Sequence, residues 1–75
     1  MKFVVSYLSY KRAVKGLTQE EVANALGVTQ TAISALERYK ARLKQENIEK
    51  YCQAIDITLE EFEDAFKNKK MISLV

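Results

Sequence analysis

The chain has 75 residues, of which 48% are hydrophobic and 29% are charged, and its formal net charge is +2. This composition argues against disorder and allows one small domain with a modest core. No apolar run approaches the ~18 residues of a membrane helix and the N-terminus is too polar for a secretory signal, so we expect a cytoplasmic protein without a membrane partner.

Apolar spacing predicts five helices and therefore an all-α fold. The first helix is expected at 4–15, where it buries Leu8 and either Val4 or Val5. It ends at Gly16, a residue type that suits the left-handed position after a helix. The remaining helices are expected at 19–25, 30–39, 45–54 and 59–68.

Three threonines precede predicted helices and suit the N-cap position, where a hydroxyl accepts a hydrogen bond from an otherwise unpaired amide at ~1 kcal/mol. They are Thr18, Thr29 and Thr58. Glu21 and Glu61 stand three residues after the first and the last of them, which predicts two capping boxes. Ala32 holds the equivalent position after Thr29, so the third helix begins without an acid.

The stretch ALGVTQTAIS, residues 25–34, interrupts the helical pattern with one of the two glycines. Two short helices, a small Ala23 at their crossing, Gly27 at the turn and Val28 in the corner are the features of a helix-turn-helix. Val22, Leu26, Ile33 and Leu36 would fix the angle between the helices. The alternative is a simple helix break in a bundle whose faces contact only protein.

The charge pattern favours a surface that faces a polyanion. Residues 1–19 and 38–45 carry basic side chains and no acid, whereas 46–66 carry seven acids and one lysine. Segregation of this size also occurs without a function. The outward side of the third helix is more specific, because none of its expected residues is acidic: Gln30, Thr31, Ser34, Ala35 and Arg38.

The residue types that carry most catalytic and metal chemistry are scarce. Histidine is absent, and the one cysteine, Cys52, cannot form an internal disulfide and suits a buried apolar position. No glycine-rich loop is present to hold a phosphate, and the paired glutamates stand at helix starts, where the dipole favours acids. We expect no enzyme activity, no cofactor, no metal and no small-molecule ligand.

The stretch TQEEVANALGVTQTAISALER resembles the helix-turn-helix of the Cro and lambda-repressor-like family, often called XRE regulators. The resemblance extends from Leu8 to Phe62, because NIEKYCQAIDITLEEF is similar to the fourth and fifth helices of that family. It implies a five-helix lambda-repressor-like domain at 1–70, a tail at 71–75, and a DNA-binding transcriptional regulator associated with the nucleoid. The alternative function is a small helical protein-interaction module without DNA binding.

In this fold the second helix of the pair lies in the major groove. Gln30 is the leading base reader, because its amide can pair with adenine N6 and N7, and the methyl groups of Thr31 and Ala35 suit thymine. Ser34 is a weaker candidate for a base contact. Expected phosphate contacts are Thr18, Gln19, Arg38, Lys40, Arg42 and Lys44, with guanine as the alternative for Arg38. The alternatives for the others are an ordinary first-turn residue at Gln19 and a solubilising loop at the basic positions.

The sequence departs from the family at two positions. Tyr39 replaces the usual glycine after the recognition helix, so we expect that helix to run on for an extra turn, which affects the roles of Lys40 and Arg42. Asp56 stands where the family often has glycine, and aspartate tolerates the left-handed conformation better than most residues. The resemblance also implies a salt bridge between Arg12 and Glu37 that ties the first helix to the third.

Regulators of this shape usually pair on a palindrome with half-sites about 34 Å apart, so we expect a homodimer on a double-stranded DNA operator that acts by promoter occupancy, as a phage repressor or controller protein does. Candidate dimerisation residues are Leu59, Phe62, Phe66, Met71, Ile72 and Leu74. The tail NKKMISLV, residues 68–75, either extends the fifth helix or forms a short strand. The alternative to a dimer contact is that this tail folds back on its own core.

Overall fold

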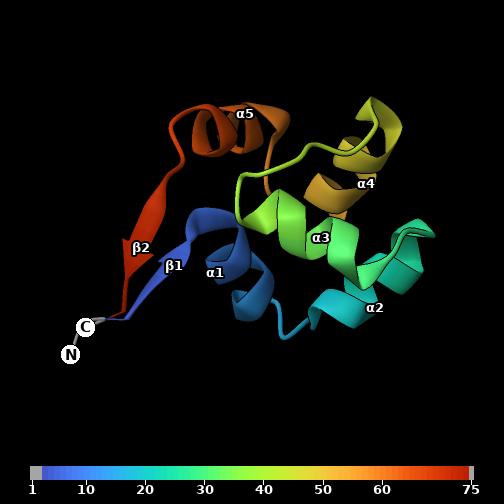
Figure 1. Cartoon of the computed structure of the whole chain (residues 1–75), viewed down its shortest axis with the longest axis horizontal. Helices are drawn as coiled ribbons and strands as arrows, with labels where there is room; N and C mark the ends of the chain where they lie inside the picture. Colours follow the sequence, from blue (N-terminus) through green and yellow to red (C-terminus); the bar gives the residue numbers. More distant parts are fainter. Residues whose placement is uncertain (1–2, 75) are drawn as a thin grey trace.

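The structure is a computed structural model that describes residues 3–74. Within this range it contains five helices, as predicted, and two short strands (Figure 1). The elements in chain order are β1 (Val4–Ser6), α1 (Tyr7–Val14), α2 (Gln19–Leu26), α3 (Gln30–Glu37), α4 (Gln45–Ile55), α5 (Leu59–Lys67) and β2 (Met71–Ser73). Among these residues, no helix combines the length and the hydropathy needed to span a bilayer.

The three threonine caps are present, and their hydroxyls set the starts of α2, α3 and α5. Thr18 and Thr58 form complete capping boxes with Glu21 and Glu61. Thr29 accepts a hydrogen bond from the amide of Ala32, and the first turn of α3 contains no acid. These local signals were sufficient to place the helix starts at 19, 30 and 59.

The prediction of a first helix at 4–15 is wrong at its start, because Val4–Ser6 form a strand instead. β1 pairs antiparallel with β2, so that Val4 lies opposite Ser73 and Val5 opposite Ile72. Val4 is 51% exposed, and Ser6 caps α1 by accepting a hydrogen bond from the amide of Ser9. β-branched side chains favour a strand once another segment returns to pair with them.

The two strands form a ribbon at one end of the molecule, beside the helices (Figure 1). The helices enclose a core of fully buried side chains, which include Leu8, Ile33, Leu36, Ile48, Tyr51, Ile55 and Phe62. Cys52 is 3% exposed, and burial raises the pKa of its thiol to about 11, so the group is neutral at physiological pH.

Tyr39 ends α3 and connects it to the ribbon. The expected extra turn of the recognition helix does not form, because Tyr39 adopts a left-handed conformation with φ of 58° and the helix ends at Glu37. The Tyr39 hydroxyl accepts a hydrogen bond from the amide of Tyr7 at 3.1 Å and donates one to the carbonyl of Lys70 at 2.6 Å. One side chain therefore joins the end of α3 to the start of α1 and to the residue before β2.

Asp56 also adopts the left-handed conformation, with φ of 59°, at the end of α4. The glycine that the family often has there is therefore not required, as the sequence predicted.

Candidate nucleic-acid interface

The turn between α2 and α3 is built from backbone hydrogen bonds around Gly27. This glycine has φ of 71°, and its amide and that of Val28 bond to the carbonyl oxygens at the end of α2, with 3.0 Å between the Val28 amide and the Ala23 carbonyl. Left-handed φ suits glycine, which has no Cβ to clash. Thr29 then caps α3, so the turn is only three residues long and the angle between the two helices is closely constrained.

Buried side chains hold the two helices against the core. α2 buries Val22, Ala23 and Leu26, and α3 buries Ile33 and Leu36. Val28 is half-buried and packs against this cluster from the corner. The small Ala23 is 2% exposed, which agrees with the close crossing that the sequence predicted.

The outward edge of α3 carries polar and small side chains. Gln30 and Thr31 are exposed on the first turn, Ser34 and Ala35 are half-buried one turn later, and Arg38 is exposed directly after the helix. The edge thus presents an amide, hydroxyls and methyl groups, with a cation at the end and no acid among these five residues. Such a surface can make hydrogen bonds and apolar contacts to base edges without repelling phosphates.

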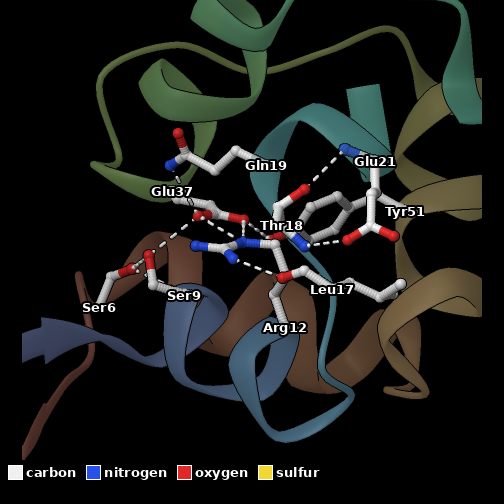
Figure 2. Close-up of polar contacts among 9 residues, drawn as sticks. All are labelled: Ser6, Ser9, Arg12, Leu17, Thr18, Gln19, Glu21, Glu37 and Tyr51. Atoms are coloured by element: carbon white, nitrogen blue, oxygen red, sulfur yellow. Dashed lines mark hydrogen bonds and ion pairs between the residues drawn. The ribbon is translucent and has the colours of Figure 1, made fainter. Parts of the chain in front are cut away.

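The carboxylate of Glu37 is fully buried and is the centre of a hydrogen-bond network at the other end of α3 (Figure 2). Arg12 Nε donates to both oxygens of Glu37, at 3.1 and 2.8 Å, which makes the ion pair that the resemblance implied. Ser9 Oγ lies 3.0 Å from Glu37 Oε1, and Tyr51 OH lies 2.6 Å from Oε2. The negative charge of Glu37 and burial raise the pKa of Tyr51, with burial as the larger cause.

Gln19 belongs to the same network, which the sequence did not predict. Its Nε2 donates to Glu37 Oε1 at 3.2 Å (Figure 2). This contact fixes the direction of the Gln19 amide at the start of α2. α1, α2 and α4 each contribute a donor to one carboxylate on α3.

Thr18 is engaged in its capping box. Its hydroxyl accepts from the amide of Glu21, and its own amide donates to Glu21 Oε1, each at 3.0 Å (Figure 2). A phosphate at this helix start would therefore have to use the hydroxyl hydrogen of Thr18 or replace the Glu21 carboxylate.

Arg42, a predicted phosphate contact, is paired with an acid of its own chain. Its guanidinium pairs with both oxygens of Glu63 on α5, at 2.8 and 2.9 Å. It also lies over the rings of Phe62 and Phe66, 5.6 and 5.2 Å from their centroids. The other two basic residues of this segment, Lys40 and Lys44, are exposed.

The predicted dimerisation residues divide into two groups. Phe62 is fully buried inside its own protomer, and Phe66 is half-buried and stacks on it with 5.7 Å between ring centroids. Phe62 is therefore removed from the candidates, because its side chain is part of the core. Leu59, Met71 and Leu74 are exposed and Ile72 is half-buried.

Sequence reasoning missed Ser6, Ser9 and Tyr51 as polar members of the site. The spacing of Ser9 and Arg12 on one helical face is a signal that could have indicated a shared partner. The spacing of Ile48, Tyr51 and Ile55 places Tyr51 on an apolar helical face, and a buried tyrosine hydroxyl normally requires a hydrogen-bond partner. Ser6 donates to Ser9 Oγ at 2.9 Å and becomes recognisable only once α1 is known to begin at Tyr7.

A family model described as helix-turn-helix matches residues 8–62 of the chain. The match begins in α1 and ends in α5, so it includes the turn at Gly27, the outward edge of α3 and the Glu37 network. Both strands of the ribbon lie outside it.

We expect Glu37→Ala to lower the free energy of unfolding by about 3–5 kcal/mol, because it removes one partner from a buried ion pair and leaves the arginine without its carboxylate. Urea denaturation followed by circular dichroism measures this change. Glu49→Ala, at an exposed position on α4, is the control and should shift the free energy by no more than about 0.5 kcal/mol. Equal stability of the two variants would contradict the structural role of Glu37.

The Arg42 pair predicts a pH-dependent stability. Hydrogen bonding to Arg42 lowers the pKa of Glu63 from its ordinary value of 4.5. A lowered folded pKa means that the pair stabilises the protein above that ordinary value and stops doing so as the pH falls through the folded value.

We expect the difference in Tm between the wild type and Arg42→Ala to shrink as the pH falls from neutral to about 2. Lys40→Ala, which removes a cation from the same loop, corrects for the general effect of net charge. A difference in Tm that stays constant over this range for Arg42→Ala would contradict the ion pair.

Proposed function

Because the chain belongs to the helix-turn-helix family of XRE-type DNA-binding regulators, we propose that it is a sequence-specific transcriptional regulator that binds operator DNA as a homodimer. The observation that supports this most directly is the outward edge of α3. A short turn and a buried network fix the helix, and its exposed residues are polar or small, with a cation at the end. In this fold such an edge enters the major groove.

Gln30 is proposed as the principal base reader. It is the first residue of α3 and is exposed, so its amide can approach a base edge that lies in front of the helix N-terminus. A glutamine makes two hydrogen bonds to adenine, worth ~1–3 kcal/mol of discrimination against other bases. Thr31 and Ala35 offer methyl groups for the C5-methyl of thymine, and Ser34 offers a hydroxyl beside them.

Phosphate contacts are proposed around this edge. Arg38, Lys40 and Lys44 are exposed and lie in the segment that follows α3. At the start of α2, Gln19 is held by Glu37 at a helix N-terminus, where partial positive charge and amide groups favour a phosphate. Thr18 could add its hydroxyl, whereas Arg42 would first have to leave Glu63. These contacts would set the orientation of the protein on the duplex without reading sequence.

A monomer places one recognition helix in one groove and reads few base pairs. A two-fold dimer reads two half-sites about 34 Å apart, which is why a palindromic operator is the expected target. We propose that the dimer covers or flanks a promoter and thereby represses or activates transcription by occupancy. The protein would act in the cytoplasm, on the DNA of the nucleoid.

We expect binding to duplexes selected from random sequence to weaken steeply with salt. A dimer that neutralises ~6–10 phosphates should give a slope of about −5 to −9 when the logarithm of the binding constant is plotted against the logarithm of salt concentration. Fluorescence anisotropy with labelled duplex measures this slope. If no duplex is retained even at low salt, the chain is a protein-interaction module and the proposed function is wrong.

Two substitutions distinguish base contacts from phosphate contacts in the proposed interface. Gln30→Ala should reduce discrimination at one base pair of each half-site by ~1–3 kcal/mol, whereas Lys44→Ala should weaken binding to all duplexes alike and lower the salt slope by about 1 for each phosphate that is no longer neutralised. Gln53→Ala, at an exposed position on α4, is the control and should bind as the wild type does. If Gln30→Ala leaves the sequence preference unchanged, Gln30 does not contact a base.

A further inference from the structure

Exposed apolar side chains gather at one end of the molecule. Within residues 3–74, all but one of the large hydrophobic side chains that are strongly exposed lie on the β ribbon or on the neighbouring α1. The exception is Leu59, on α5. By the register of the strands, Val4 and Met71 lie on the face of the ribbon opposite to that of Val5 and Ile72. We call the four other side chains, on the α1 side of the ribbon, the ribbon surface: Phe3, Tyr10, Val14 and Leu74.

The ribbon has little support of its own. Each strand is three residues long, and the sheet contains two strands. An isolated two-stranded sheet is at best marginally stable in water and requires packing against another layer. The rest of the protomer does not cover the ribbon completely, because the side chains of Val4 and Met71 are each 51% exposed.

A hollow of about 410 Å³ lies between the ribbon and α1. Its apolar lining comes from Val5, Tyr10, Ala13, Val14 and Leu74. The polar residues in the lining are Ser9 and Arg12, and both already donate to Glu37. A small-molecule site normally offers a few uncommitted polar groups that orient its ligand, so this hollow is better suited to an apolar protein surface.

We propose that the ribbon surface is the homodimer interface, where a second copy of this chain seats its own ribbon over the hollow. This proposal deepens the proposed function, on which it rests for the need to pair two recognition helices. The interface would be isologous, because the hollow and the side chains that cover it belong to the same surface and a two-fold axis brings each over the other.

The charge distribution favours a second copy over a different partner. Residues 3–6 and 71–74 contain no charged side chain, so two identical ribbons can meet without like-charge repulsion. The surface of α5, by contrast, carries acids that follow one another closely: Glu60, Glu61, Glu63 and Asp64. Paired about a two-fold axis, such a surface would repel its copy.

The exposed area is that of a small interface. The four side chains of the ribbon surface are between 37% and 61% exposed. At roughly 150–200 Å² for a large side chain, they present on the order of 350 Å² per protomer. A pair would therefore bury ~700 Å² from these side chains, and the neighbouring Val5, Ala13 and Ile72 would supply the remainder of the ~1,000 Å² that is the lower limit for a specific protein interface.

The position of the ribbon gives the interface a defined relation to DNA. The Tyr39 hydroxyl bonds to Tyr7 and Lys70, the residues that flank the two strands, and Tyr39 itself follows α3. A dimer joined through the ribbon would therefore hold its two recognition helices at a fixed separation.

The test is sedimentation equilibrium of the full chain without DNA. We expect the wild type to dimerise at micromolar concentration, and the double variant Val14→Lys/Leu74→Lys to raise the dimer dissociation constant by at least about tenfold. Leu59→Lys is the matched control and should dimerise as the wild type does. Circular dichroism checks folding, and Val14→Lys alone, at a position 61% exposed, replaces the double variant if that fails to fold.

The proposal is overturned if the wild type remains monomeric. It is also overturned if a folded ribbon variant dimerises as the wild type does, or if Leu59→Lys becomes monomeric. The DNA measurement is independent of this one. A monomer that binds DNA would disprove the dimer interface but not the DNA-binding function. A dimer that binds no DNA would disprove the DNA-binding function but not the interface.

Discussion

The buried carboxylate of Glu37 is the interaction on which the arrangement of this protein depends. An ionised carboxylate is costly to remove from water unless charge and hydrogen bonds compensate for it. Here Arg12, Ser9, Gln19 and Tyr51 compensate it, and they come from three other helices. Because all these donors share one acceptor, the network fixes the C-terminal end of α3 relative to α1, α2 and α4. The turn at Gly27 fixes the N-terminal end of α3. The edge that would meet DNA is held between two constraints.

The charges that the sequence places near α3 are not all free of partners within the chain. Arg42 looked equivalent to Lys40 and Lys44, but its planar guanidinium fits the Glu63 carboxylate and the faces of two phenylalanine rings. The lysines have no such geometry and remain exposed. One basic residue thus connects the loop after α3 to the acidic α5, and Arg38, Lys40 and Lys44 are the cations left for phosphates.

Tyr39 combines an unfavourable backbone conformation with hydrogen bonds to distant segments of the chain. A tyrosine in the left-handed conformation is disfavoured, and a glycine would adopt it more easily. The hydroxyl, however, bonds to the backbone of two segments that a glycine could not reach, and the ring lies edge-on to Phe66 at 5.7 Å. The same residue ends the recognition helix and anchors the ribbon, so the proposed dimer contact and the proposed DNA contact are parts of one rigid unit.

The sequence by itself determined the five helices, three threonine caps, the turn at Gly27, the acid-free edge of α3 and the family, because these depend on interactions within one or two helical turns and on apolar spacing. It did not determine that Val4–Ser6 form a strand, because valines fit either structure until β2 returns to pair with them. Nor did it show that Arg42 pairs with Glu63, 21 residues away, or that Gln19 donates a hydrogen bond to Glu37, 18 residues away. Those contacts exist only once the chain is packed, since the tertiary structure decides which charged and polar groups come within hydrogen-bonding distance.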